Sequence, residues 1–459
     1  MTAMSETKKA ALNGKYAAYP EYKDSGVEWL DYLPLHWKTV SLKMLIDVRD
    51  GTHDTPPYVE KSESSFPLVT SKDVTGGKID LSHCKQISKD DYISIIKRSA
   101  VSVGDILMPM IGTVGSPILV KNEANFAIKN LALFKTSNTN NLINKTYLLY
   151  FLNSNECSLQ FSLESRGGVQ NFVSLGTLRN LGLPLVSLDE QTQIAAFLDH
   201  ETAKIDTLIE KQQQLIELLK EKRQAVISHA VTKGLNPDAP MKDSGVEWLG
   251  EVPEHWVVTK TSYCSTSLDA FRIPIEANIR GNRQGQYPYY GASGVIDFVD
   301  DYLFDDDLIL VCEDGWNLML RTQPVARFVT GKIWVNNHAH ILKPIDIDAT
   351  LLAECIELTP LNLFISGMRQ PKLTADSLKN IPVAYSIDKE EQDELVNFIS
   401  KYKKQILQLT NKAQHSIELL QERRTALISA AVTGKIDVRN WIAPTTSSDA
   451  NEAQQEATA

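Results

Sequence analysis

The chain has 459 residues and a formal net charge of −10, with 43% hydrophobic and 23% charged residues. This composition predicts a globular protein of two or three domains. No apolar run reaches the roughly 18 residues that span a bilayer, and the N-terminus lacks the apolar core of a signal peptide, so we expect no membrane partner. The acidic balance excludes a simple polycationic nucleic-acid binder, so any contact with DNA needs local positive charge or a partner subunit.

Residues 1–20 are polar, and we expect a flexible N-terminus there. A short box follows, KDSGVEWLDYLPLHW, from Lys23 to Trp37. The box returns as KDSGVEWLGEVPEHW from Lys242 to Trp256, an offset of 219 with eight consecutive identical residues. The repeat predicts one unit that occurs twice: a first globular domain at 21–184, with the box at 23–37, and a second at 234–382, with the box at 242–256.

Both globular segments read as strand-rich with many turns. In each one, a turn leads into a buried strand and a Gly-containing loop, first through Gly104-Asp105-Ile106-Leu107 and later through Asp306-Asp307-Leu308-Ile309. Each segment closes on an apolar strand that contains Pro184 or Pro382. Elsewhere the two hardly agree, which predicts a shared scaffold with different surface loops.

A long helix follows each segment, at 185–233 and again at 383–440. Positions 190–232 map onto 391–433 with an offset of 201, and neither copy contains Gly or Pro before its end. Each copy spans about 65 Å at 1.5 Å per residue and has a heptad-like seam that a lone helix cannot bury. We expect the copies to pair, although two ordinary bundle helices are the alternative. The remaining residues, 441–459, read as a disordered tail.

Catalytic motifs are missing. No G-x-x-x-x-G-K-[ST] phosphate loop occurs. Thr55-Pro56-Pro57-Tyr58 resembles the motif of amino-methyltransferases, but Thr55 replaces the polar residue that holds the target amine, so we interpret it as a rigid turn. His338 and His340 share one face of a strand without further ligands and are interpreted as structural. Five scattered cysteines without a C-x-x-C indicate reduced cytosolic thiols and no zinc site.

Loop chemistry suited to DNA remains. Arg, Asn and Gln pair bidentately with base edges, and glycines let a loop backbone approach the duplex. The second segment holds 11 basic against 15 acidic residues between Lys260 and Lys379, so a few arginines must form its DNA face. For each residue alone, a solvated loop is the alternative. The candidate DNA-binding residues are Arg49, Thr52, His53, Lys72, Lys78, Arg166, Gln170, Arg272, Arg280, Arg283, Arg369, Gln370 and Lys372.

As a set, the duplicated box and the duplicated helix ending E-x-R-x-A-x-I-S-x-A-V-T resemble the specificity subunit of a type I restriction–modification system, over residues 21 to about 440. Arg49-Asp50-Gly51-Thr52-His53 and Gly104-Asp105-Ile106-Leu107 add to the resemblance. It implies an α+β fold in which two strand-rich target-recognition domains are joined by two long helices forming an antiparallel coiled coil, with an internal pseudo-two-fold repeat. Each domain would read one half of a bipartite, asymmetric double-stranded DNA target in the prokaryotic cytoplasm.

The resemblance also implies a non-catalytic chain that binds no cofactor. Two modification (methyltransferase) subunits would dock on the helices, and restriction/translocase subunits would add DNA cleavage; S-adenosylmethionine, ATP and Mg²⁺ would belong to these partners. A stand-alone sequence-specific DNA-binding regulator is the main alternative, and a self-contained methyltransferase or nuclease is disfavoured because its motifs are missing. The candidate partner-binding residues are Leu208, Leu215, Leu219, Ile406, Leu409 and Leu420.

Overall fold

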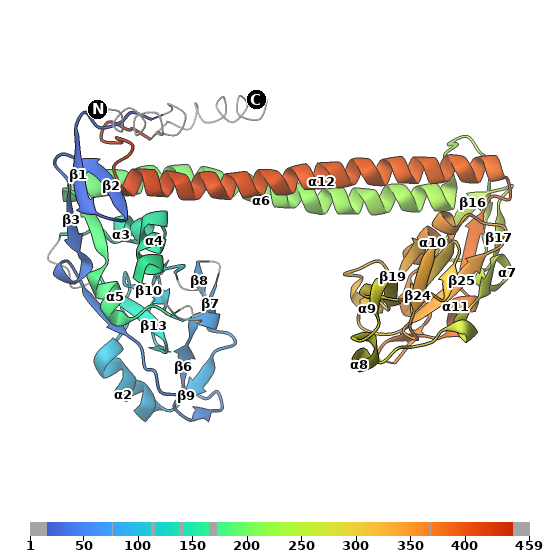
Figure 1. Ribbon diagram of the computed structural model, residues 1–459, viewed down its shortest axis with the longest axis horizontal. Coiled ribbons are helices and arrows are strands. Elements are labelled where there is room, and N and C mark those ends of the chain that lie inside the picture. The colour runs from blue at the N-terminus through green and yellow to red at the C-terminus, as the bar shows by residue number, and fades with distance from the viewer. Residues whose placement is uncertain are drawn as a thin grey trace. The chain divides into compact units, whose positions relative to one another are not determined.

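The computed structural model describes residues 16–75, 77–111, 115–136, 142–164, 172–367 and 369–443 (Figure 1). The chain forms two compact units. Unit 1 comprises Met1–Gln212 and His415–Ala459, and unit 2 comprises Gln213–Gln414. Both boundaries fall inside long helices. Each unit therefore contains one strand-rich domain, the first part of the helix that follows it, and the last part of the other long helix.

Unit 1 contains two four-stranded sheets, in the orders β11-β10-β13-β4 and β12-β6-β9-β5. The first sheet is antiparallel, and in the second β12 runs parallel to β6. Its strands are β1 (Tyr22–Val27), β2 (Leu30–Pro34), β3 (Lys38–Ser41), β4 (Asp47–Asp50), β5 (Tyr58–Val59), β6 (Phe66–Val69), β7 (Val74–Thr75), β8 (Lys78–Ile79), β9 (Lys85–Ile87), β10 (Ile106–Pro109), β11 (Ile118–Leu119), β12 (Ala127–Ile128), β13 (Leu131–Lys135) and β14 (Gly182–Leu185). Its helices are α2 (Lys89–Ser99), α3 (Lys145–Leu152), α4 (Asn155–Glu164), α5 (Leu175–Asn180) and the start of α6 (Leu188–Lys233).

Unit 2 repeats the strand order of the first sheet, but its second sheet differs, because β21 pairs with β24 whereas β5 of unit 1 pairs with β9. Its sheets are ordered β18-β25-β22-β23 and β20-β19-β24-β21, again with one parallel pair, β19 and β24. Its strands are β15 (Met241–Asp243), β16 (Glu251–Pro253), β17 (Val257–Lys260), β18 (Ser265–Ser267), β19 (Gln284–Gly291), β20 (Gly294–Val299), β21 (Phe304–Asp305), β22 (Leu308–Cys312), β23 (Ala326–Val329), β24 (Lys332–Val335), β25 (Ala339–Pro344), β26 (Ile365–Ser366), β27 (Lys372–Leu373) and β28 (Pro382–Tyr385). Its helices are α7 (Thr261–Cys264), α8 (Ala277–Arg280), α9 (Asn317–Leu320), α10 (Ala349–Leu358), α11 (Ala375–Lys379) and the start of α12 (Lys389–Val432).

The two domains share the expected turn, buried strand and closing strand. Every residue of β10 and of β22 is buried. The proline-containing closing strands β14 and β28 pair antiparallel with the first strands of their domains, β3 and β17. The mixed α+β architecture with two long helices confirms the fold class predicted from the repeat.

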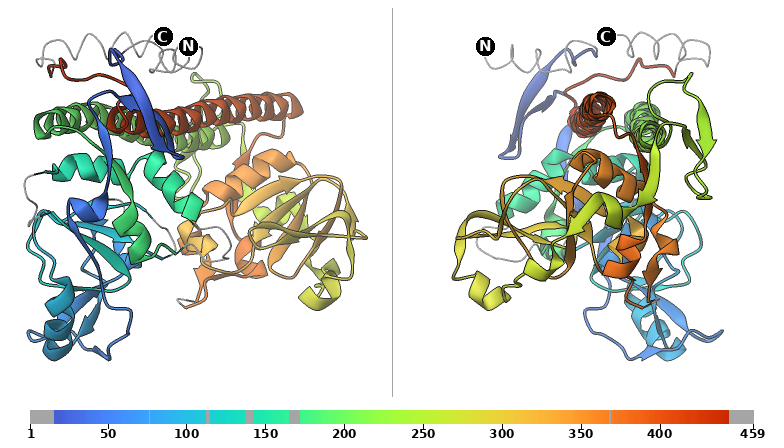
Figure 2. Two further views of the ribbon diagram at one scale, coloured as in Figure 1. Left: turned by 60° about the vertical axis from the view of Figure 1, so that its left-hand side comes forward. Right: turned by 90° about the vertical axis from the view of Figure 1, so that its right-hand side faces the viewer.

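The end of each long helix completes the core of the other repeat's domain. In unit 1, Ile428 and Val432 of α12 lie in one buried cluster with Trp37 and Phe197. Figures 1 and 2 show α3 and α4 against this part of the helix pair, where the amide of Asn155 donates to the hydroxyl of Ser429 at 2.9 Å. In unit 2, Ile227 and Val231 of α6 pack in the same way with Trp256, Leu395 and Ile399. The helices therefore run antiparallel within each unit.

The buried seam of α6 differs in detail from the expected one. The expected steps pass through Leu208 and Leu215, but Leu215 is 44% exposed and Leu208 only half-buried. Ile209 is half-buried like Leu208, Ile216 is half-buried where Leu215 is exposed, and Leu219 is buried as expected. The reason is geometric, because neighbouring residues 100° apart on a helix can both border a seam and the partner helix decides which one enters it.

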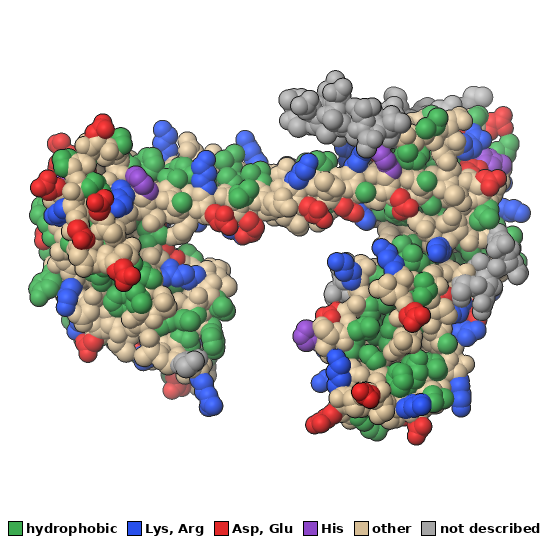
Figure 3. Space-filling view, turned by 180° about the vertical axis from the view of Figure 1, so that it is seen from behind, with side chains coloured by type: hydrophobic (Ala, Val, Ile, Leu, Met, Phe, Trp, Pro, Cys, Tyr) green, Lys and Arg blue, Asp and Glu red, His purple; other side chains and the backbone are tan. Residues whose placement is uncertain are grey.

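In α12, Ile406 is buried, but Leu409 is 48% exposed. Thr410, one residue after Leu409, is half-buried, and Ile417 is buried. Figure 3 shows hydrophobic side chains exposed among charged ones along the helix pair. The pair thus buries one stripe within the chain and leaves leucines outside that stripe uncovered.

A glutamate in the first turn of each long helix binds the repeated box. In unit 1, Glu190 accepts hydrogen bonds from the phenol of Tyr19 at 2.6 Å and the indole of Trp37 at 3.1 Å, and His36 Nε2 lies 3.0 Å from it. In unit 2, Glu391 holds Trp256 at 3.0 Å and His255 at 2.8 Å. Burial disfavours the ionised form of Glu391, but the hydrogen bonds from Ser386, Trp256 and His255 outweigh burial and lower the pKa of Glu391.

The next residue, a glutamine, binds the domain itself. Gln191 accepts from the amide of Asn144 at 2.8 Å and donates to the carbonyls of Leu142 and Val186. Gln392 makes the matching contacts with the amide of Asp348 and the carbonyls of Asp346 and Ser386. Asn144 and Asp348 are the N-caps of α3 and α10. The Glu-Gln pair therefore joins the box, a domain helix and the long helix at one point in each unit.

The N-terminal expectation needs correction from Tyr16 onward. Tyr19 is 1% exposed, and the guanidinium of Arg439 lies 4.9 Å from the centre of its ring. The carbonyl of Ala17 accepts from the amide of Asp437 at 2.7 Å, and Trp441 packs edge-on against Phe197. Aromatic burial thus fixes a segment that composition alone marked as loose. Residues 1–15 and 444–459, the rest of both expected loose ends, lie outside the described residues.

Within the described ranges, no helix combines the length and apolar character needed to cross a membrane.

We predict that Glu190→Ala lowers the free energy of unfolding of unit 1 by about 2–4 kcal/mol, because buried Tyr19 and Trp37 donors lose their charged acceptor. Urea unfolding followed by tryptophan fluorescence measures the effect. Glu210→Ala is the matched control, since Glu210 lies exposed on the same helix. Equal stability of the two variants would refute the anchoring role of Glu190.

Candidate nucleic-acid interface

An acidic residue lies at the same place in both domains. Asp50 ends β4 and Asp269 follows β18, and the two are 219 residues apart, which is the offset of the repeated box. The register agrees, because Val48 pairs with Phe134 while Ser267 pairs with Leu342 in the equivalent sheet. The equivalence of Asp50 and Asp269 is not evident from the sequence, because the residues around them differ.

In unit 1, Asp50 organises the loop of Arg49 to His53. It accepts from His53 Nε2 at 2.8 Å and from Arg98 at 2.9 Å. His53 Nδ1 lies 3.0 Å from the amide oxygen of Asn130, and these hydrogen bonds to Asp50 and Asn130 raise the pKa of His53. A side chain at Gly51 would meet the carbonyl oxygen of Ile128 at 2.3 Å, so only glycine fits this turn. The loop is therefore held on both sides before any ligand binds.

In unit 2, Asp269 belongs to a larger network of charges. Arg272 donates to Glu313 at 2.6 Å, and Lys372 lies 3.1 Å from the same carboxylate. His340 Nδ1 lies 2.6 Å from Asp269. Burial works against ionised Asp269 and Glu313, but their cationic hydrogen-bond partners outweigh burial and lower both pKa values. The expected DNA contacts Arg272 and Lys372 are thus brought together, and both are bound to Glu313.

Each domain also bridges the loop after its central buried strand to a second loop. Ile111 pairs with Phe172 in unit 1, and Asp314 pairs with Lys372 in unit 2. Three exposed apolar side chains lie at or near these bridges: Ile111 is 38%, Phe172 45% and Trp316 56% exposed. Sequence reasoning missed Trp316, although its place directly after Gly315 in a predicted loop was a usable signal. An exposed aromatic residue beside a loop of Arg, Gln and Lys suits stacking on a base.

The two arginines of the Gly-rich loop are engaged within the chain. Arg280 donates to Asp297 at 2.8 Å, its guanidinium lies 5.0 Å from the centre of the Tyr289 ring, and it is 18% exposed. Arg283 donates to Asp300 at 2.9 Å, lies 5.0 Å from the Trp334 ring and is 31% exposed. Both contacts fix the arginines against aromatic rings, and Arg283 presents more of its surface to solvent.

The other candidates are scattered over unit 1 and the second loop of unit 2. Arg49 pairs with Asp47 at 2.6 Å, Thr52 forms a bridge to Lys129, and exposed Lys72 and Lys78 lie beside the β7–β8 hairpin. Arg369 and Gln370 are exposed next to Lys372. Arg166 and Gln170 lie outside the described residues.

Neither metal nor thiol chemistry is supported by the described side chains. No group of three or more His, Cys, Asp or Glu side chains suited to a metal ion occurs in the described ranges. Burial raises the pKa of all five cysteine thiols, to about 12 for Cys84 and Cys355 and about 11 for Cys264 and Cys312, with Cys157 higher still. All five are free and buried, so their thiolates are disfavoured.

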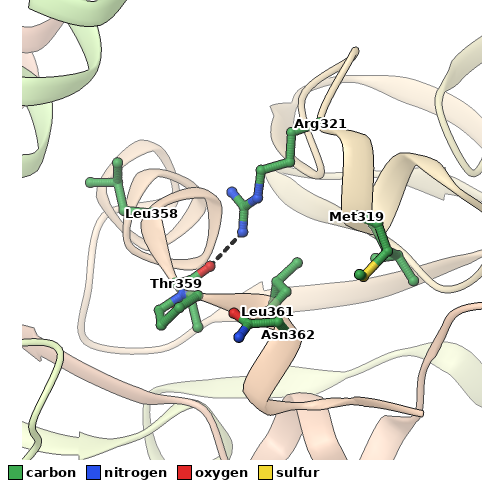
Figure 4. Close-up of a pocket in the computed structure, with 8 residues that line it drawn as sticks. Met319, Arg321, Leu358, Thr359, Leu361 and Asn362 are labelled. Carbon is green, nitrogen blue, oxygen red and sulfur yellow. Dashed lines mark hydrogen bonds between the residues drawn. The ribbon is translucent and has the colours of Figure 1, made fainter. Parts of the chain in front are cut away.

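A cavity of about 300 Å³ lies between α9 and the end of α10 (Figure 4). Arg321 reaches across it and donates to the carbonyl of Thr359 at 2.5 Å and to that of Glu357. These carbonyls belong to the last turn of α10, where a cation satisfies groups that lack helical partners. The lining combines Leu318, Leu358 and Leu361 with Arg321, Thr359 and Asn362, and Arg321 caps the helix end within it.

The two domains share the strand order of their first sheet and carry different loop clusters. The family model described as type I restriction modification DNA specificity domain matches residues 34–218 and 271–419. The chain belongs to this family.

Individual relatives are more distant. The chain is 26% identical over 181 residues to the type I restriction enzyme EcoBI specificity subunit of Escherichia coli, covering 39% of this chain and 38% of that one. It is 24% identical over 229 residues to the type I restriction enzyme MjaVIII specificity subunit of Methanocaldococcus jannaschii, covering 50% and 49%. The chain spans about half the length, or less, of the curated relatives it matches.

Among solved structures, the chain is similar to one from work on complex assembly and conformational transition of the type I R-M system. The TM-score is 0.64 at 16% identity, over 88% of this chain and 99% of that one. This likeness concerns the fold.

We predict different consequences for the two loop arginines. Arg283→Ala should weaken DNA binding, either by about 1–3 kcal/mol at one base pair or uniformly with a salt slope about one unit smaller, according to whether it contacts a base or a phosphate. Arg280→Ala should lower the melting temperature more than it changes binding, because Arg280 is the more buried. Salt titrations with cognate and single-mismatch duplexes, together with thermal melts, measure both. Unchanged binding by Arg283→Ala would place this loop away from the DNA.

Proposed function

We propose that the chain is the DNA sequence-specificity subunit of a type I restriction–modification enzyme. Each strand-rich domain reads one half of a bipartite, asymmetric target. The chain itself is non-catalytic. Its modification partners bind S-adenosylmethionine, and its restriction partners use ATP and Mg²⁺. Because its target is DNA, the chain acts in the prokaryotic cytoplasm.

One observation carries the proposal: two domains whose first sheets have the same strand order present different loops at the same place. Asp50 and Asp269 occupy equivalent positions, yet Asp50 binds His53 and Arg98 while Asp269 binds Arg272 and His340. A scaffold that is repeated while its loops diverge is expected of a protein that must recognise two different sequences with one architecture. Bases are read by loop side chains at defined positions, so divergent loops imply divergent half-sites.

Exposed leucines on the helix pair support docking of two modification subunits. Leu218 is 61% and Leu407 60% exposed, beside the expected Leu215 and Leu409. Exposed apolar side chains along a helix suit association with a partner. The expected partner residues Leu219 and Ile406 are instead buried within the chain, so they support the pair and not the partner directly.

A stand-alone DNA-binding regulator is the competing function. Its helices would need no outer apolar face, so the exposed leucines favour the subunit. Co-expression with a modification subunit followed by gel filtration separates the two. A co-eluting complex that is lost in Leu218→Glu with Leu407→Glu supports docking, and a chain that elutes alone contradicts it.

We predict that the recognition domains are exchangeable. Replacing residues 38–184 with the equivalent region of another family member should change one half of the methylated target and leave the other half intact, because the loops of the two domains lie in separate units. Mapping of methylated adenines in cells that carry the hybrid measures the outcome. Replacement of residues 257–382 is the matched control and should change the opposite half. Changes in both halves from one exchange would contradict modular reading.

We also predict that the helix pair sets the gap between the half-sites. The helices pair along one seam, so one heptad must be added to each helix. Asp206 and Arg424 form an ion pair at 2.9 Å and mark the same level of the pair. The insertions are therefore placed five residues after Asp206 and five residues before Arg424. Seven residues add about 10 Å, or about three base pairs of duplex. The methylation map should show a gap lengthened by about that amount. The same insertion in one helix alone misaligns the seam and serves as the control. An unchanged gap in the double insertion would show that the helix pair does not set the distance between the half-sites.

A further inference from the structure

A buried histidine lies in the charge network of unit 2. His340 lies on β25 and is 1% exposed. Its Nδ1 lies 2.6 Å from Asp269 Oδ2, and its Nε2 lies 2.8 Å from the carbonyl oxygen of Leu373. A carboxylate and a carbonyl can only accept hydrogen bonds, whereas a neutral imidazole has only one N–H to donate. The two contacts together require the doubly protonated imidazolium.

The charges packed around His340 fit a cation at this place. Asp269 comes from the segment after β18, and Glu313, from the loop after β22, lies 3.8 Å from Nδ1. Arg272 and Lys372 share the oxygens of Glu313. The exposed His338–Asp314 pair, at 2.8 Å, completes the charged groups of the loop. Without the imidazolium charge, half-buried Asp269 would keep the amide of Ile341 and one cationic side chain, Arg272, whose Nη2 lies 3.8 Å away.

The network joins three segments that are far apart in sequence. Asp269 accepts from the amide of Ile341, which holds the 269–272 segment to β25. The amide of Leu373 donates to the carbonyl of Glu313, and the amide of Gly315 donates to that of Pro371. His340 contacts the first segment through Asp269 and the last through Leu373. It thus lies beneath the loops that carry Arg272, Trp316 and Lys372.

We propose that His340, held as an imidazolium, is the positioning residue of the second recognition domain. Its charge and its two N–H groups hold the segment of Arg272 and the bridged loops of Trp316 and Lys372 in the arrangement that contacts DNA. This inference rests on the proposed function of unit 2 as a DNA reader. His340 contacts no DNA itself, and it acts through the loops above it.

The pH dependence has a defined sign. Burial disfavours the charged ring, but the hydrogen bonds to Asp269 and Leu373 and the charges of Asp269 and Glu313 outweigh burial and raise the pKa of His340. A pKa raised on folding stabilises the protonated arrangement fully below the ordinary histidine pKa of about 6.5, and this stabilisation is lost as pH rises through the folded value. Discrimination by the second domain should therefore decline on the alkaline side.

The test uses the assembled complex with modification subunits and a duplex of the target found by methylation mapping. In His340→Gln, a donor toward Leu373 is retained but the charge is lost. Discrimination against mismatches in the half read by unit 2 should fall about tenfold at neutral pH, which matches the loss of one charge-assisted hydrogen bond. The alkaline decline should also disappear. His229→Gln, at an exposed histidine of α6 outside the loops, should keep both the discrimination and its pH profile.

Mismatches in the half read by unit 1 are the internal reference and should respond to neither substitution. Equal loss of discrimination in both halves would show a general folding defect and overturn the positioning role. Unchanged discrimination in His340→Gln would overturn it as well.

Two measurements need no DNA and leave His340 in place. The ring protons of His340 should titrate above pH 6.5 in NMR, and titration at or below that value would refute the imidazolium. Trp316 is the one strongly exposed tryptophan among seven, all of which lie in the described ranges. The fluorescence that Trp316→Phe removes should change with the same pKa, and a flat response would refute the coupling to the loop. If the complex shows no sequence preference at any pH, the proposed function fails, while these two measurements still decide whether His340 positions the loops.

Discussion

The structure depends on a glutamate and a glutamine that begin each long helix. Glu190 and Glu391 are the acceptors for the tryptophan and histidine of the repeated box. The following glutamines satisfy the N-terminal turn of α3 or α10. A carboxylate shared by several buried donors is expensive to remove and tolerates little displacement. Because the end of the opposite long helix packs against the same box, these contacts also explain why two copies occur in one chain.

With the scaffold fixed at that point, the loops are free to differ. The proposed contact of this acidic chain with DNA depends on a few cations held in defined positions. The candidate cations of unit 2 are held against carboxylates and aromatic rings and are not spread as bulk positive charge. Arg272 and Lys372 share Glu313, and Arg283 lies between Asp300 and Trp334. Such an arrangement limits the side-chain entropy lost on binding and favours defined geometry over general attraction to phosphate.

The repeat made much of the fold predictable, because an exact offset in the box and helix fixes the unit whatever the loops contain. The closing strands with Pro184 and Pro382 and the central buried strands agree with expectation. The long helices are shorter than the expected 185–233 and 383–440, since α6 covers Leu188–Lys233 and α12 covers Lys389–Val432. The exact seam was not predictable, since Leu215 and Ile216 both border it and the partner helix selects between them. The packed N-terminal segment was missed because Tyr19 gains its burial from Glu190, 171 residues away. Loop composition identified Arg280 and Arg283 as candidate DNA contacts. Their carboxylate partners could not be predicted, because strand pairing in the folded domain brings them together.

The most direct test of the account is a genome-wide map of methylated adenines in cells that carry the complete system, compared with cells that lack this chain. Two domains with separate loop clusters, linked by two long helices, predict methylation at an asymmetric motif of two specific parts separated by a gap of fixed length. That methylation should vanish when the chain is deleted. A continuous palindromic motif, or a methylation pattern that survives deletion of the chain, would contradict the account.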